Sequence, residues 1–296
     1  MPSAIGSALP AAPPARSSSF LARLFRDKPL GAAGGVVLLV FLIVGLGAQW
    51  VSPYGFNEIA PIERLRPPSW AHWFGTDHLG RDVLSRCIYG AQLSVIIGCG
   101  AAGLATIIST LIGIVSGYAG GRLDLIVQRF VDAWQSFPDL IILIVVVSVI
   151  GPGMPQIIGT LALLLGIAGS RIVRSAVLSV REHMYVHAAQ SVGASVPRIL
   201  WRHILPNVMP PIIVLFTTRV GTVILAESGL AFLGLGVPPP SPTWGSMLSG
   251  SGRTYMFQGP WLALAPGLCL TAVVYATNVF GDALRDLLDP RMRGAR

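Results

Sequence analysis

The chain has 296 residues, of which 53% are hydrophobic and only 11% are charged. This balance excludes an ordinary soluble domain, in which about a quarter of the residues are charged, and it indicates an integral membrane protein. The formal net charge is +8. Three isolated cysteines, Cys87, Cys99 and Cys269, form neither a disulfide framework nor a metal-binding pattern.

Six apolar segments are each long enough to cross a hydrocarbon core of about 30 Å, which takes about 20 helical residues. We predict membrane-spanning helices at residues 31–50, 93–117, 127–150, 156–174, 207–234 and 261–283. The predicted fold class is therefore an all-α integral membrane protein with six transmembrane helices. The third segment is irregular, because its first half is polar and Pro138 should kink it or start a helix.

Basic residues are distributed unevenly across these spans. Fourteen of the 21 lie in the two tails, the 118–124 loop and the 171–206 loop, and five lie in the opposite loops. Because Lys and Arg accumulate on the cytoplasmic side, we expect both termini in the cytoplasm, and nucleic-acid binding is not needed to explain the charge. The predicted order is a cytoplasmic, largely disordered tail at 1–30, a first span at 31–50, an extracytoplasmic loop at 51–92, a five-span core at 93–283 with a cytoplasmic loop at 175–206, and a cytoplasmic tail at 284–296.

The expected extracytoplasmic loop contains the sequence Phe-Gly-Thr-Asp-His-Leu-Gly-Arg-Asp-Val-Leu-Ser-Arg at residues 74–86. Its glycines, Gly75 and Gly80, predict turns. The apolar residues that follow recur at helical spacing. We predict a short capped helix there that tethers the loop to the bilayer.

The most informative polar stretch is residues 184–206, between two apolar spans. We predict a helix over residues 184–192, with Val186, Ala189 and Val192 on one apolar stripe. Gly193 then takes the left-handed conformation that ends this helix. Ser195 then caps a second short helix, and Pro206 separates that helix from the next span. Two amphipathic helices at a rigid corner either lie on lipid or form a compact knob that fits a protein cleft. Their narrow, alanine-rich apolar stripes favour the knob.

No catalytic pattern stands out in the sequence. A phosphate-binding P-loop needs Gly-Lys-Ser/Thr, and the one lysine, Lys28, is followed by Pro29. His183 and His187 are four residues apart on a predicted helix, which is a spacing that metal sites use. Without a third ligand, we interpret them as solvated surface histidines. We therefore predict a non-catalytic chain with no cofactor or metal of its own.

Three segments resemble the permeases of ABC importers, and more narrowly those for oligopeptides, dipeptides and nickel. They are the Ala-Ala…Gly…Ile-Leu-Pro pattern at 188–206, the Phe-Gly-Thr-Asp pattern at 74–86 and the Leu-Ala-Glu-Ser-Gly pattern at 225–236. The family loop usually begins with Glu, and this chain has His187 at that position. The matches extend over most of the chain from about residue 70 onward. The resemblance implies the type I ABC importer permease architecture and a C-type membrane subunit of a peptide importer.

The resemblance also implies roles for particular residues and partners. The residues that would couple the chain to an ATPase are His187, Ala188, Ala189, Gly193, Ala194, Ser195, Ile204, Leu205 and Pro206. The extracytoplasmic family motif comprises Gly75, Thr76, Asp77, Gly80, Arg81, Asp82 and Arg86. The implied partners are a homologous permease, two ATPase subunits or domains that hold ATP and magnesium, an extracytoplasmic solute-binding protein and the lipid of the bacterial cytoplasmic membrane.

Glu227 is a carboxylate inside a predicted span. A charge there is costly and usually faces the bundle interior or a wet cavity. Arg219 lies on the same helix face, but about 12 Å away along the axis, which is too far for a direct pair. We expect both residues to line the translocation pathway, where Glu227 meets a charged peptide terminus. The alternative is a structural contact of Glu227 with the partner permease.

The predicted function is therefore that of a permease subunit in an ATP-driven peptide importer. A nickel or other small-solute importer is the alternative within the family, although the external loops offer no cluster of histidines. A secondary transporter would predict an internal repeat and helices broken near mid-membrane. A membrane enzyme would need a catalytic constellation. The sequence gives no convincing sign of either pattern.

Overall fold

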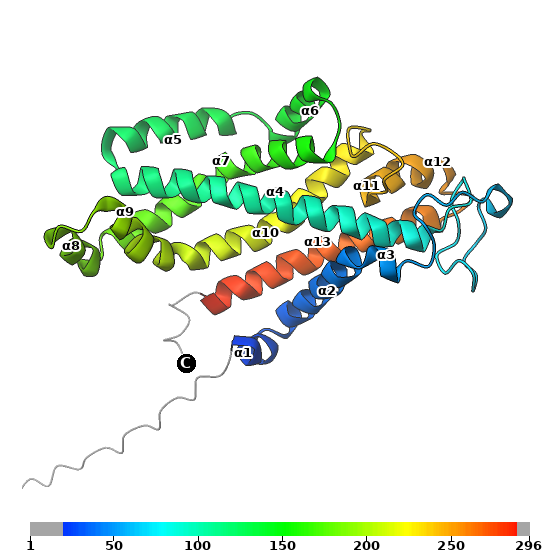
Figure 1. The fold of residues 1–296 in the computed structure, drawn as a ribbon, viewed down its shortest axis with the longest axis horizontal. Coiled ribbons are helices and arrows are strands. Elements are labelled where there is room, and N and C mark those ends of the chain that lie inside the picture. The colour runs from blue at the N-terminus through cyan, green and yellow to red at the C-terminus, as the bar shows by residue number, and fades with distance from the viewer. Residues whose placement is uncertain (1–19, 289–296) are drawn as a thin grey trace, which may run out of the picture.

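The computed structural model describes residues 20–288, and this part of the chain is helical apart from its loops and one isolated β-bridge. Four long helices run side by side along the molecule (Figure 1): α4 (Val83–Ala119), α7 (Met154–Arg181), α10 (Leu205–Phe232) and α13 (Trp261–Leu288). Three further helices flank them: α2 (Pro29–Leu46), α5 (Gly121–Gln135) and α6 (Asp139–Ile150). The predicted all-α membrane fold is confirmed.

Short elements occupy the two ends of this bundle. At one end lie α1 (Phe20–Asp27), α8 (Met184–Ser191), α9 (Val196–Ile199) and the π-helical turn η2 (Leu200–Ile204). At the other end lie α3 (Ala48–Val51), the 3-10 turn η1 (Pro61–Glu63), α11 (Trp244–Met247), the π-helical turn η3 (Leu248–Gly252) and α12 (Arg253–Tyr255).

Within residues 20–288, five helices are long and apolar enough to cross a membrane. The pair α5 and α6 makes a sixth span if it is counted as one, although its two helices are bent by 82°. Pro138 has the extended backbone of a residue that precedes a helix (φ −62°, ψ 126°) and α6 starts directly after it. The predicted interruption at Pro138 is confirmed, because a proline cannot continue the hydrogen bonding of the helix before it.

Several of the predicted segments begin or end at the wrong residue. α4 begins at Val83, so residues 83–92 of the expected 51–92 loop are helical, and the short tethering helix is the first part of the 37-residue α4. Asp82 causes this early start, because its side chain accepts the N–H of Ser85 at 2.7 Å and caps the helix. Helices α1 and α2 likewise occupy residues 20–30 of the expected disordered tail, and α13 extends to Leu288. Residues 1–19 and 289–296 lie outside the described part of the chain.

Small residues bring α4 and α7 into close contact. A β-carbon at Gly113 would lie 2.7 Å from both the Ser170 carbonyl oxygen and the Val173 β-carbon. One at Gly117 would lie 3.1 Å from the Arg174 carbonyl oxygen. Because these positions carry no side chain, the two backbones can approach closely, which is how apolar helices associate in lipid.

The main core lies where α4, α6, α7 and α10 meet. Its buried residues are Ile97, Ala101, Ala102, Leu143, Val147, Ile157, Leu161, Leu164, Val223 and Leu230. A smaller cluster near the start of α4 packs Cys87 against Cys269 of α13. These two cysteines are far apart in the sequence, and the fold brings them together as free thiols.

Candidate functional site

The loop between α7 and α10 has the predicted corner. Gly193 follows α8 with φ +79°, in the left-handed region. Its N–H donates to the Gln190 carbonyl at 2.9 Å, and the Ala194 N–H donates to the Ala189 carbonyl at 3.0 Å. These are the two hydrogen bonds of a Schellman motif, which ends a helix at a glycine. The predicted helix and its glycine stop are confirmed.

The second half of the loop differs from the prediction. Ser195 has the extended backbone of an N-cap, but its side chain makes no capping hydrogen bond. Residues 196–232 then form one helix, so Pro206 does not separate the loop from the span. The π-helical turn η2 explains the difference. Its wider bonding pattern, in which the Leu205 N–H donates to the Leu200 carbonyl, accommodates a proline directly afterwards.

The apolar stripes of the loop face this chain. Val186, Ile199 and Ile204 are buried in a cluster with Val173 and Val177 of α7. The partly buried residues at the edge of this cluster include Ala189, Ala194 and Leu205. The cluster holds α8 and α9 firmly against the ends of α7 and α10, so the loop and the two long helices form one unit.

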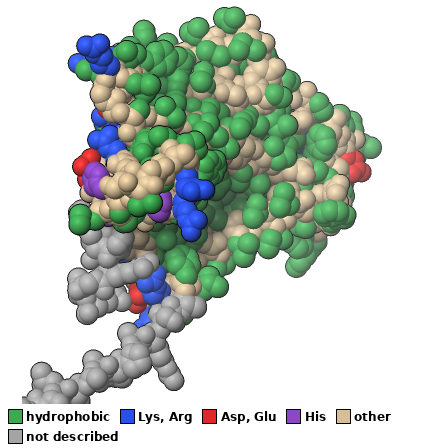
Figure 2. All heavy atoms as spheres, turned by 60° about the vertical axis from the view of Figure 1, so that its left-hand side comes forward, with side chains coloured by type: hydrophobic (Ala, Val, Ile, Leu, Met, Phe, Trp, Pro, Cys, Tyr) green, Lys and Arg blue, Asp and Glu red, His purple; other side chains and the backbone are tan. Residues whose placement is uncertain are grey.

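The outer surface of the loop is available to a partner. Five of the residues that were predicted to couple the chain to an ATPase are exposed: His187, Ala188, Gly193, Ser195 and Pro206. We call the residues at its far end, Met184, His187, Ala188, Val192 and Gly193, the loop tip. Met184 and Val192 are each 88% exposed, so Val192 is not on the buried stripe that its spacing predicted. Arginine and histidine side chains gather at this end of the molecule, next to a largely hydrophobic flank (Figure 2).

Two arginines of α7 connect the base of the loop to α4 and α5. Arg174 donates two hydrogen bonds to Asp124, from Nε at 2.6 Å and from Nη2 at 2.5 Å. Arg181 donates to the carbonyl oxygens of Gly117 at 3.3 Å and Tyr118 at 3.1 Å. Because α7 leads into the loop, these hydrogen bonds fix the base of the loop to α4 and α5.

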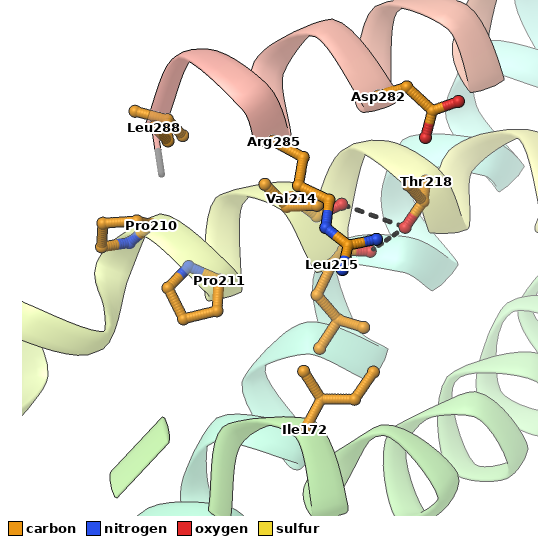
Figure 3. Close-up of a pocket in the computed structure, with 9 residues that line it drawn as sticks. All are labelled: Ile172, Pro210, Pro211, Val214, Leu215, Thr218, Asp282, Arg285 and Leu288. Carbon is orange, nitrogen blue, oxygen red and sulfur yellow. Dashed lines mark hydrogen bonds between the residues drawn. The ribbon is translucent and has the colours of Figure 1, made fainter. Parts of the chain in front are cut away.

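A groove of about 500 Å³ lies between α7, α10 and α13, close to the point where the loop joins α10 (Figure 3). Its lining residues are Ile172, Pro210, Pro211, Val214, Leu215, Thr218, Asp282, Arg285 and Leu288. The two prolines lie inside α10 and remove two of its backbone N–H donors, which weakens the helix there. No sequence pattern marks Asp282 and Arg285, because charges near the end of a last span are ordinary.

The predicted extracytoplasmic motif residues meet in one network. The buried carboxylate of Asp77 accepts the backbone N–H of Arg81 at 3.0 Å and its Nε at 2.7 Å. Arg86 Nε lies 3.8 Å from the same carboxylate. Gly75 (φ +70°) and Gly80 (φ +78°) are in the left-handed region, which confirms the two predicted turns.

Thr76 and Asp82 attach this network to the long helices. Trp261 at the start of α13 donates its indole N–H to the Thr76 carbonyl at 3.1 Å. Asp82 caps α4 with one oxygen and contacts His72 Nδ1 with the other, at 2.9 Å. We call residues 52–82, which belong to the loop predicted to be extracytoplasmic, the cap. Its hydrogen bonds connect α4 to α13 at the end of the bundle opposite the loop tip.

His72 lies between two carboxylates in this cap. Its Nδ1 is 2.9 Å from Asp82 and its Nε2 is 3.0 Å from Glu63. Only the protonated imidazolium can donate from both nitrogens. Burial lowers the pKa of His72, but the hydrogen bonds to the two carboxylates outweigh burial and raise the pKa above 6.5.

The cap should therefore loosen as the pH rises. Because the pKa of His72 is higher in the folded state than its ordinary value of 6.5, its stabilisation is fully present below pH 6.5 and is lost as the pH rises through the folded-state pKa. Amide hydrogen exchange of residues 52–82, corrected for intrinsic rates, should accelerate over that range, and His72→Gln should remove the effect. His78→Gln is the matched control, because burial lowers the pKa of His78. An unchanged pH dependence in His72→Gln would contradict this prediction.

Arg219 and Glu227 are both buried inside this chain, with exposed fractions of 6% and 1%. The two side chains do not pair with each other, which agrees with the prediction that they lie too far apart along the helix. Arg219 Nη2 donates to Ser109 Oγ at 2.9 Å and to the Leu165 carbonyl, which links α10 to α4 and α7. Glu227 accepts a hydrogen bond from Ser228 Oγ at 3.4 Å. Neither residue lines the groove between α7, α10 and α13.

Residues 109–294 match the family model described as "Binding-protein-dependent transport system inner membrane component". The chain belongs to this family. The matched region contains the loop tip, the cluster beneath it and the groove beside α10. Membership makes the chain a multi-pass membrane component of a transport system, in agreement with its apolar helices.

Three relatives are similar to this chain over nearly their full lengths. The dipeptide transport system permease protein DppC of Alkalihalophilus pseudofirmus is 39% identical, covering 90% of this chain and 88% of the relative. The probable peptide ABC transporter permease protein y4tQ of Sinorhizobium fredii is 40% identical, covering 93% of each. The glutathione transport system permease protein GsiD of Escherichia coli is 38% identical, covering 92% and 90%. The chain is thus an ABC transporter permease.

A solved structure of the MetNI methionine ABC transporter in inward facing conformations contains a similar fold. The match has a TM-score of 0.56 at 17% identity, and it covers 69% of this chain and 96% of the other. This likeness confirms the type I importer permease fold that the sequence resemblance implied.

Proposed function

We propose that this permease is one of two membrane subunits of an importer for di- or oligopeptides, driven by ATP hydrolysis on separate chains. The observation that carries the coupling role is the loop between α7 and α10, whose buried side is fixed to both helices and whose tip is exposed. The peptide substrate is supported by the names of the relatives, which are a dipeptide, a peptide and a glutathione permease. A nickel or other small-solute importer is the alternative.

In the proposed mechanism, the loop tip sits in a groove of an ATPase subunit or domain. Closure of two such ATPases around ATP and magnesium moves the tip. Because Val186, Ile199 and Ile204 fix the loop to α7 and α10, these helices follow the tip. The groove beside Pro210 and Pro211 leaves α10 room to tilt relative to α13. ATP shifts the balance of inward and outward states only if it binds one of them more tightly.

The remaining partners follow from the same proposal. A homologous permease completes a heterodimer, and a solute-binding protein delivers substrate on the side of the cap, which is extracytoplasmic in this proposal. Both termini and the loop tip then face the cytoplasm of a bacterial cell, as the distribution of basic residues favours. His187 is exposed at the loop tip, so the ATPase groove should suit an imidazole where the family usually presents a carboxylate.

Reconstitution with the native partners tests the proposal. The complex is placed in lipid nanodiscs, and ATP hydrolysis is measured with the binding protein alone, with a dipeptide added and with nickel added. We expect stimulation by the dipeptide. Stimulation by nickel alone would favour the small-solute alternative. Uptake driven by an ion gradient without any ATPase subunit would overturn the proposal in favour of a secondary transporter.

Replacing Glu227 with alanine should impair uptake while assembly with the ATPase survives. An ionisable group inside a span is expensive to bury, so we expect this one to serve transport. Uptake assays on membrane vesicles check this, with Glu227→Gln as the control that keeps size and acceptor. Loss of assembly in Glu227→Ala would instead favour a structural role for Glu227.

A further inference from the structure

Helix α1 is amphipathic, and the proposed function does not use it. Phe20, Leu21 and Phe25 are 39%, 63% and 58% exposed, although they are large and apolar. At 100° per residue, these side chains occupy one side of α1, and Arg23 and Arg26 occupy the other. The middle of the apolar side, Leu24, is buried against the end of α13. The rest of that side is uncovered within the described chain.

The first span places α1 at the membrane surface. α2 begins at Pro29 and is apolar from its start, so Lys28 marks the border between hydrocarbon and headgroups. Lys28 has a non-helical backbone (φ −136°, ψ 65°), so α1 does not continue the axis of α2. An eight-residue helix is about 12 Å long. α1 therefore stays in or next to the headgroup layer, at the same end of the bundle as α8 (Figure 1).

Polar contacts fix the orientation of α1 and leave one basic side chain exposed. Lys28 Nζ pairs with Asp286 of α13 at 2.5 Å, and Arg23 donates to the Leu287 carbonyl at 3.4 Å. With Leu24 buried, these bonds hold α1 against the end of α13. Arg26 is exposed on the polar side of the helix. A short helix held at a membrane surface, with exposed Phe and Leu on one side and Arg on the other, has the chemistry of an interfacial anchor.

We propose that α1 lies parallel to the membrane surface, at the level of the headgroups, and binds anionic phospholipid in the leaflet on the side of the loop tip. Phe20, Leu21 and Phe25 enter the boundary between headgroups and acyl chains, and Arg26 contacts the anionic headgroups. A cation close to an anionic lipid surface strengthens binding about fivefold. The inference requires only that α2 crosses the membrane, and it does not depend on the substrate.

Hydrogen exchange in defined lipids tests the inference on the full chain. The chain is reconstituted in nanodiscs of phosphatidylcholine, with or without phosphatidylglycerol, and exchange of residues 20–27 is followed by mass spectrometry. We expect exchange to be about fivefold slower in the anionic discs. Arg26→Gln should lose that difference, and Phe25→Ser should lose protection in both lipids. Arg253→Gln, an exposed arginine at the opposite end of the bundle, is the matched control and should behave as the unaltered chain.

Two outcomes would overturn the inference. Equal exchange in both lipids, unaffected by Arg26→Gln, would mean that contacts with α13 alone hold α1. Protection that arises only when the partner permease is added would assign the apolar side to a protein interface. Unchanged exchange across α4 in every variant shows that the fold is intact, so a loss of protection at residues 20–27 reports on α1 itself.

Discussion

Gly193→Pro should abolish substrate-stimulated ATP hydrolysis and uptake, while the chain still inserts into the membrane. Gly193 has φ +79°, and proline is fixed near −65°. Proline also lacks the N–H that Gly193 donates to Gln190. The corner must therefore rearrange, at a cost of about 3 kcal/mol or more. The rearrangement moves the loop tip, so under the proposed function a movement of the ATPase subunits no longer reaches α7 and α10. ATPase and uptake assays on the reconstituted complex measure this.

Gly193→Ala is the matched control for the corner. An alanine β-carbon would meet no atom within 4 Å, so only the left-handed backbone opposes it, at about 1–2 kcal/mol. We expect this variant to keep most of the stimulation. If the complex with Gly193→Pro hydrolyses ATP and transports substrate as well as the complex with Gly193→Ala, the corner does not transmit force. The proposed coupling role of this loop is then wrong.

Gly113→Val should have the largest effect on the fold, because it separates α4 from α7. The added β-carbon would lie 2.7 Å from the Ser170 carbonyl oxygen and 2.9 Å from the Arg174 backbone nitrogen. Backbone atoms in a long helix cannot move aside locally, so the two helices must shift. Such overpacking costs about 1–3 kcal/mol or more. Thermal denaturation of the purified chain in detergent should show a clear loss of stability and a lower yield of folded protein.

Gly103→Val provides the comparison within the same helix. The nearest atom to its β-carbon would be in the Phe216 ring, at 4.0 Å, which is an ordinary contact that the ring can adjust. We expect almost no change in the melting temperature for this variant. Equal melting of the Gly103 and Gly113 variants would show that the close approach of α4 and α7 does not support the fold.

Features that depend on local chemistry were predictable from the sequence. The apolar lengths predict most of the spans, and the break at Pro138 follows from the missing N–H of proline. The end of α8 at Gly193 follows from the left-handed conformation that glycine tolerates. The early start of α4 also had a local signal, since Asp82 precedes an apolar run and is a favoured N-cap.

Features that depend on tertiary contacts were not predictable in the same way. The burial of Arg219 arises from Ser109 and Leu165, which are distant in sequence and meet it only when α4, α7 and α10 assemble. The exposure of Val192 depends on the corner turning away from the cluster beneath α8, which a helical repeat does not encode. The continuous helix through Pro206 depends on the π-helical turn before it, and proline alone predicted a break.

The exposed loop tip is the part of the chain that must meet an ATPase if the proposed function is correct. The most direct measurement is site-specific photocrosslinking, with a photoreactive residue placed at Val192 in the reconstituted complex. Val192 is 88% exposed, and the buried Val186 on the same helix serves as the control position. We predict crosslinks from position 192 to the ATPase, with a yield that changes on ATP binding, and none from position 186. Crosslinks from position 192 to lipid alone, with the ATPase crosslinked to another surface of the chain, would contradict the coupling role of this loop.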